Sequence, residues 1–174
     1  MTTPANPRVR KEGKRNRAPT QGERPAHQVI LRMDDAPSPE VAPDVQFHED
    51  LRLIVWKPRG VLDEAAVNKV LADLQRREAA ADRPFNRFSD LSVVESFHLT
   101  FKYVLHVALS RRLSYAGREP VKSAFFVTHP QAAQIVKIHA LVTDHSPLQV
   151  EMFEEREAAA KWLGVPVESL TLSG

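Results

Sequence analysis

From Val45 onward, short apolar runs alternate with longer stretches of helical periodicity, and this alternation is the feature that most restricts the fold. The strand-like runs lie at 45–47, 51–57, 85–91, 121–128 and 148–154. The order is β-β-α-β-α-β-α-β-α, and each helical connection is long enough to return the chain to a parallel neighbour. The pattern predicts an α/β fold with a mixed, mostly parallel sheet of four to five strands flanked by helices.

The first two strand-like runs predict a hairpin, because only the polar residues "HED" separate them. In the second run, Leu51, Leu53 and Val55 share one face, while Ile54 and Trp56 make the other face apolar as well. A strand that is apolar on both faces is typical of one covered on both sides.

Helix starts and ends are marked by capping residues. Asp63 is a candidate N-cap for a helix that runs to about Ala80, and Pro130 suits the first position of a later helix. Helical spacing also returns from about Ser96, which predicts that the strand at 85–91 leads directly into a helix with Phe97 and Phe101 facing the core. Gly164 marks the end of the last helix.

The first 44 residues form a segment of different composition. They hold seven of the 13 prolines, and residues 1–27 carry seven Arg or Lys against two Glu. Such a segment cannot bury enough surface to offset its ordering entropy, so 1–44 is predicted to be a disordered tail before a domain at 45–170. The tail is either a solvated extension or a contact for nucleic acid or an acidic partner, unless translation begins at Met33.

Composition excludes several classes of protein. There is no cysteine, which removes disulfides, thiolate metal sites and a cysteine nucleophile, and the six glycines are too scattered for a phosphate-binding loop. No apolar stretch reaches membrane-spanning length, and the N-terminal region is charged where a secretion signal would be apolar. We therefore expect a cytoplasmic protein without membrane insertion.

No motif indicates catalysis, a cofactor or a metal site. The histidines at 98, 106, 129, 139 and 145 do not have the spacing of metal ligands, and the glutamates at 151, 154, 155 and 157 are better explained by the start of a helix. We expect no catalytic residue, no metal and no cofactor. Arg111, Arg112 and Arg118 are a candidate anion-binding patch, with cations at a helix C-terminus as the structural alternative.

Three motifs between Val45 and Pro166 carry a family resemblance. They are "LRLIVWKPRGVLD", "FSDLS" and "VEMFEEREAAAKWLG". In this order and spacing the chain resembles the STAS family, the sulfate-transporter and anti-sigma-factor-antagonist domains, and especially its SpoIIAA-like bacterial relatives. The resemblance implies a mixed sheet flanked by helices and a role in protein recognition rather than catalysis.

The resemblance also implies a regulatory site. In the family's anti-sigma antagonists, a partner kinase phosphorylates a serine at the start of the helix after the D-L-S strand, and here Glu95 and Ser96 stand where the family has Asp and Ser. Phe97 and His98 replace the small residue and the glycine that follow. Ser96 is accordingly the candidate phosphosite, or simply the helix N-cap. Ser92, Glu95, His98 and Thr100 form the candidate docking surface for a protein partner.

Some SpoIIAA-like proteins also resemble lipid-binding domains of the CRAL-TRIO type, which implies a different function. It would place a small apolar or lipid-like ligand in a pocket lined by Phe97, Phe101, Phe125 and Phe126. The sequence therefore predicts a non-enzymatic interaction module of a bacterial cytoplasm, with a carrier of a small apolar ligand as the alternative.

Overall fold

The structure is a computed structural model that describes residues 44–81 and 83–172. The tail predicted at 1–44 lies, apart from Asp44, outside these residues, and so does Met33. The division into a tail and a domain at 45–170 therefore stays a prediction.

The described residues form seven strands, four α-helices and one short 3-10 helix. The strands are β1 (Val45–His48), β2 (Leu53–Trp56), β3 (Gly60–Asp63), β4 (Asn86–Asp90), β5 (Val94–His98), β6 (Val121–Phe126) and β7 (Leu148–Phe153). The helices are α1 (Glu64–Ala81), α2 (Phe101–Ser114), α3 (Pro130–Thr143), α4 (Arg156–Leu163) and η1 (Val167–Leu170).

The main sheet has five strands in the order β1-β2-β4-β6-β7. β1 pairs antiparallel with β2, and every other neighbouring pair is parallel. The predicted hairpin and the mixed, mostly parallel sheet are both confirmed. β4 is the middle strand, so both of its edges are hydrogen-bonded.

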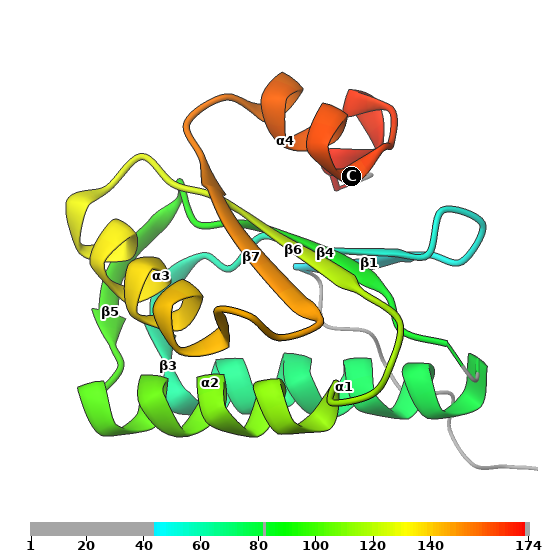
Figure 1. Cartoon of the computed structure of the whole chain (residues 1–174). Coiled ribbons are helices and arrows are strands. Elements are labelled where there is room, and N and C mark those ends of the chain that lie inside the picture. Colours follow the sequence, from blue (N-terminus) through cyan, green and yellow to red (C-terminus); the bar gives the residue numbers. More distant parts are fainter. Residues whose placement is uncertain (1–43, 82, 173–174) are drawn as a thin grey trace, which may run out of the picture. The chain divides into compact units, whose positions relative to one another are not determined.

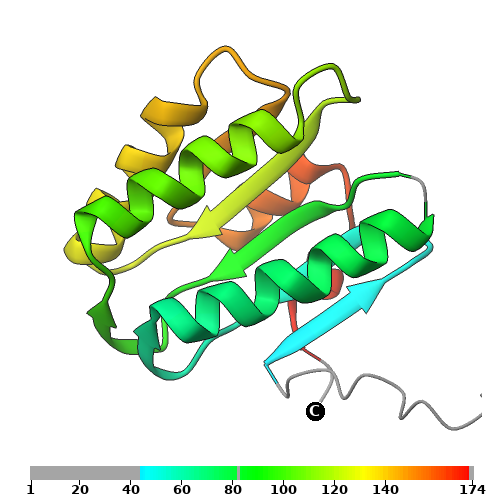
Figure 2. The same ribbon diagram turned by 90° about the horizontal axis from the view of Figure 1, so that it is seen from below.

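Helices cover both faces of this sheet. α4 and η1 lie on one side, whereas α1 and α2 lie on the other, with α3 beside α2 (Figure 1). Seen from below, α1 and α2 lie alongside each other across the sheet (Figure 2). On β2, Leu53 and Val55 pack in the α4 core, while Ile54 packs against Val70 and Leu74 of α1. The prediction that this strand is covered on both sides is confirmed.

The start of α1 also follows the sequence prediction. Asp63 Oδ1 accepts a hydrogen bond from the backbone N–H of Ala66 at 2.8 Å, as expected of an N-cap side chain. β3 was not predicted; it ends at Asp63 itself and pairs in parallel with β5 as a separate two-stranded sheet.

The predicted helix start at Ser96 is wrong. Ser96 lies inside β5, opposite Val61 of β3, and the N-cap of α2 is Thr100, whose Oγ1 accepts a hydrogen bond from Tyr103 N at 3.1 Å. The physical reason is that "VESFH" finds a parallel partner in β3, and strand pairing overrides the helical spacing of its apolar residues. Ser96 is therefore neither a helix cap nor a helix-start residue.

The two phenylalanines around this junction have different environments. Phe97 is buried as predicted, but Phe101 is 65% exposed, so its predicted place in the core is wrong. The buried side of α2 follows Val104, Ala108 and Arg111 instead. Phe101 lies on another side of α2. It belongs to the row of residues spaced four apart that also contains the exposed Leu109.

No helix among the described residues is both long and apolar enough to cross a membrane.

Candidate functional site

A cavity of about 130 Å³ lies between the main sheet and helices α1, α2 and α3. Its apolar walls come from all of these elements. They include Ile54 of β2, Val70 and Leu74 of α1, Val104 of α2 and Val136 of α3, all of them buried. A concave, mainly apolar hollow of this kind is the usual form of a small-molecule site.

Four polar side chains form a buried arginine cluster at one end of this cavity: Glu78, Arg87, Arg111 and Tyr115. Their residues are only 7%, 8%, 3% and 1% exposed, respectively. Glu78 comes from α1, Arg87 from β4 and Arg111 from α2, while Tyr115 directly follows α2. Arg87 and Arg111 both line the cavity.

The Tyr115 hydroxyl is the centre of the cluster. It donates a hydrogen bond to Glu78 Oε2 at 2.5 Å and accepts one from Arg111 Nη2 at 2.5 Å and another from Arg87 Nη2. One donor and two lone pairs are all that a phenol offers, so the hydroxyl is fully used. Both guanidinium carbons also lie 4.8 Å from the centre of the Tyr115 ring, within cation–π distance.

Glu78 is bound to the rest of the cluster by charge. Its Oε1 lies 3.3 Å from Arg87 Nη2 and accepts a second hydrogen bond, from Phe85 N, at 3.1 Å. Within residues 44–81 and 83–172, no other carboxylate forms an ion pair with Arg87 or Arg111. The Nε atoms of both arginines are buried without a hydrogen-bond partner in that same part of the chain.

The cluster carries a net positive charge. Burial, and then the neighbouring Arg87, lower the pKa of Arg111 to about 10, a value that keeps the guanidinium protonated at neutral pH. Burial raises the pKa of Tyr115, so the phenol is neutral. Two cations against one carboxylate leave an excess of one positive charge inside the protein.

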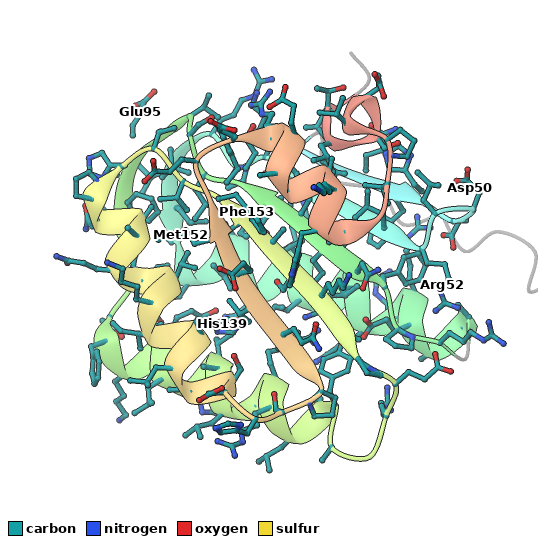
Figure 3. The ribbon with its side chains drawn as sticks, turned by 45° about the horizontal axis from the view of Figure 1, so that its top comes forward. Asp50, Arg52, Glu95, His139, Met152 and Phe153 are labelled. Atoms are coloured by element: carbon teal, nitrogen blue, oxygen red, sulfur yellow. The ribbon has the colours of Figure 1, made fainter. Side chains whose placement is uncertain are left out.

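His139 of α3 lines the same cavity and responds to the same charges. Burial, then Arg87 and Arg111, lowers the pKa of its imidazole to about 4. Its ring lies 6.0 Å from that of Phe125, which also lines the cavity, and Figure 3 shows it between α3 and the sheet. At neutral pH the side chain is therefore an uncharged wall residue.

Hydrogen bonds also join α1 and α2 at their N-terminal ends. Tyr103 Oη contacts Asn68 Oδ1 at 2.7 Å and the carbonyl of Glu64 at 3.1 Å, and Thr100 Oγ1 donates to Glu64 Oε1 at 2.9 Å. Burial and the nearby carboxylates of Glu64 and Asp63 raise the pKa of Tyr103 to about 12. The two helices are thus joined at both ends, with the apolar cavity walls between the two sets of bonds.

A second group of charges, the Asp90 cluster, lies at the C-terminal end of β4. The Asp90 carboxylate contacts Arg156 Nη2 at 2.5 Å and Lys57 Nζ at 3.5 Å, and it accepts hydrogen bonds from the backbone N–H and the hydroxyl of Ser92. Arg156 belongs to α4, so this cluster lies on the face opposite the cavity.

The candidate docking residues lie within β5 and on either side of it in the sequence. Glu95, His98 and Thr100 are exposed, and Figure 3 shows Glu95 at the edge of the molecule. Ser92 is only partly exposed, because its side chain is bonded to Asp90 at 2.6 Å. The four residues lie close in sequence, and their role in docking stays a prediction.

The candidate anion patch is not formed as predicted. Arg111 turns into the buried arginine cluster, while Arg112 is exposed and donates to the carbonyl of Val142 at 3.0 Å. Arg118 is also exposed, in the turn after Tyr115. Consecutive residues of a helix point in different directions, so Arg111 and Arg112 lie on different sides of α2.

The predicted phenylalanine pocket is correct for two of its four residues. Phe97 and Phe125 line the cavity. Phe126 follows Phe125 in β6 and packs in the core on the opposite face, because successive strand residues point to opposite sides of a sheet. Phe101 lies on the surface.

The buried arginine cluster was not predicted, although the sequence holds a signal for it. Arg87 and Ser89 alternate on a central strand whose neighbours are apolar, where a parallel sheet usually has apolar residues on both faces. Glu78 follows Leu74 by four residues, and Arg111 follows Val107 by four. Each therefore extends the apolar row of its helix and predicts a charge on the buried side.

Among the described residues, no group of three or more His, Asp or Glu side chains is arranged to hold a metal ion.

Comparisons with known proteins show a likeness to solved structures. No family model matches the chain, and no curated protein matches it. The crystal structure of an uncharacterised DUF3478 family protein from Shewanella loihica PV-4 is similar, with 15% sequence identity and a TM-score of 0.46. The likeness covers 68% of this chain and 90% of that chain. That protein is described as having a SpoIIAA-like fold, and the likeness concerns the fold alone.

Proposed function

We propose that this protein is a non-enzymatic binder of a small apolar molecule, held in the cavity between the main sheet and helices α1 to α3. The observation that carries this proposal is the cavity itself, about 130 Å³ in volume and walled by buried Val, Leu and Ile side chains. Interiors of folded proteins are otherwise packed to nearly crystalline density, so a hollow of this size is costly unless it is filled.

The volume indicates the size of the ligand. An engineered apolar cavity of about 150 Å³ in another protein stays dry and binds benzene. A ligand with a single ring or a short chain therefore fits, whereas a long acyl chain does not fit the present volume.

Titration of the full chain with toluene, followed through the methyl NMR signals of valine and leucine, tests this function. We expect shifts at Val70, Leu74 and Val104, and loss of binding in Val104→Phe, which fills the cavity. Val61→Phe is the matched control, because Val61 is 50% exposed on β3. Wall methyl signals that do not respond, or equal binding by Val104→Phe, would reject the proposal.

A second candidate function is protein docking at the two-stranded sheet of β3 and β5. It is favoured by two exposed apolar side chains: Val61 of β3, at 50% and opposite Ser96 in the ladder, and Val93, at 39% in the turn that precedes β5. Exposed valines beside the polar side chains of Glu95 and His98 have the mixed character of a contact surface.

Peptide mapping of the protein from its native cells tests the regulatory part of this second function. Phosphate on Ser96, and retention of a protein partner that changes in Ser96→Asp, would support it. Ser110→Asp is the control variant, because Ser110 is an exposed serine of α2 that lies outside the candidate docking surface. An unmodified Ser96 together with unchanged retention would argue against the switch.

A further inference from the structure

The buried arginine cluster has more positive charge than its protein partners neutralise. Glu78 is the one carboxylate among the described residues that forms an ion pair there, and the Tyr115 hydroxyl is already used for three hydrogen bonds. The cost of burying an unpaired cation is several kcal/mol even after relaxation. A site with this charge is expected to have a partner that the chain itself does not supply.

The free donors lie beside the cavity rather than in a packed wall. Arg87 and Arg111 both line it, and the Nε atoms of both are buried without a hydrogen-bond partner in the part of the chain described. A guanidinium presents its N–H groups as a planar fork that matches the two oxygens of a carboxylate. Two such groups at one end of an apolar hollow define a place for an anionic head.

The other residues at this end are compatible with an anion. His139 has a pKa of about 4, so it adds no charge at neutral pH and presents an uncharged imidazole. Ser89 and Ser123 also line the cavity, and Ser123 lies next to Arg87 in the ladder between β4 and β6. Of the residues that line the cavity, none is acidic.

We infer that the ligand of this cavity is a small apolar carboxylate, about the size of benzoate, whose acidic group pairs with Arg87 and Arg111. This inference rests on the ligand-binding function proposed above and specifies the chemistry of the ligand. The apolar part lies among Leu74, Val104 and their neighbours, and the carboxylate supplies the negative charge that the cluster lacks.

Three planar probes of nearly equal size separate charge from shape: benzoate, benzamide and benzamidinium. Their dissociation constants are measured on the full chain through the same methyl signals. We expect benzoate to bind on the order of 10- to 100-fold more tightly than benzamide, the range for hydrogen bonds to charged groups, and benzamidinium not to bind. Equal affinity for benzoate and benzamide would overturn the inference.

Two neighbouring arginines provide matched variants. Arg111→Met removes one cavity cation and keeps the Glu78–Arg87 pair, so the preference for benzoate over benzamide should disappear while benzamide still binds. Arg112→Met removes an exposed cation one residue away and should leave that preference unchanged. Equal losses in the two variants would show only a general charge effect and would overturn the inference.

The outcomes also separate this inference from the function on which it rests. If toluene and benzamide bind but benzoate has no advantage, the cavity is a site for neutral ligands and only the inference fails. If toluene and all three planar probes fail to bind, both fail. The probe series on the unmodified chain decides between these results even if Arg111→Met does not fold.

Discussion

The two charged clusters at the ends of β4 contain the same number of charges of each sign but differ in their exposure to solvent. Each has two cations and one carboxylate. In the Asp90 cluster the cations are partly in water, with Lys57 exposed by 26% and Arg156 by 30%, while the carboxylate is 2% exposed. In the buried arginine cluster the arginine residues themselves are buried, Arg87 to 8% and Arg111 to 3%. Water solvates the excess positive charge of the first cluster but not that of the second.

The difference shows which arginines are structural and which are available to a ligand. Arg156 also has an Nε without a partner among the described residues, yet its guanidinium is part of a solvated pair on the α4 face. Arg87 and Arg111 lie beside the mainly apolar cavity instead. The same residue type therefore holds α4 to the sheet at one end of β4 and prepares an anion site at the other.

The largest expected effect is from Glu78→Ala. It removes the carboxylate that pairs with the buried Arg87 and accepts the hydrogen bond of Tyr115, and breaking a buried pair in this way typically costs about 3–5 kcal/mol of the free energy of unfolding. Urea denaturation measures this loss. The control is Glu49→Ala, because Glu49 is 59% exposed in its pair with Arg77, and such surface pairs contribute about 0–1 kcal/mol. Equal losses would remove the distinction between buried and surface charge.

Asp90→Asn should be less costly. The two cations that lose their carboxylate can turn to water, and the amide oxygen still accepts from Ser92, so we expect about 1.5–3 kcal/mol, the value for hydrogen bonds to a charged group. The same urea measurement applies. A loss larger than that of Glu78→Ala would mean that the partial exposure of Lys57 and Arg156 does not relieve the cluster.

The pH dependence of stability should depend on His139. Its pKa falls from 6.5 in the unfolded chain to about 4 in the folded protein, so between these values the unfolded state binds more protons. The contribution of the group is complete above pH 6.5 and is lost as the pH falls towards 4, by on the order of 1–2 kcal/mol between pH 7 and 5. His139→Gln should flatten this part of the stability curve. Identical curves for the two proteins would contradict the assignment.

The smallest effect concerns the opposite end of α1 and α2, away from either charged cluster. Thr100→Ala removes the N-cap of α2 and the bond to Glu64, which should cost about 1 kcal/mol in thermal or urea unfolding. Ser96→Ala is its control and should change stability by less than about 0.5 kcal/mol, because Ser96 caps no helix. A larger loss of stability in Ser96→Ala than in Thr100→Ala would contradict the assignment of Thr100 as the N-cap of α2.

Periodicity was sufficient to predict most of the fold. The hairpin, the two-sided cover of β2, the Asp63 cap and the helix that begins at Pro130 all follow from apolar spacing and capping residues. These signals are local, and each one agrees with the tertiary structure around it. They predicted the class of sheet without any knowledge of its strand order.

The failures occurred where a non-local partner decides the structure. "VESFH" has apolar positions that suit the start of a helix, and only its pairing with β3 makes it a strand. The arginines show the same limit, because Arg111 and Arg112 look alike in sequence until the position of the sheet shows which one is buried. The candidate site required the spatial meeting of α1, β4 and α2, which no single segment contains.

The position of Arg87 on the middle strand has a consequence for how a ligand is chosen. Its backbone is held by ladder partners on both sides, Ile54 and Ser123, and its guanidinium is packed over Tyr115. The entropy of ordering this side chain is therefore lost during folding rather than during binding. The site is preorganised, so the free and occupied forms should have nearly the same structure, and selection among ligands should depend on charge and size rather than on rearrangement.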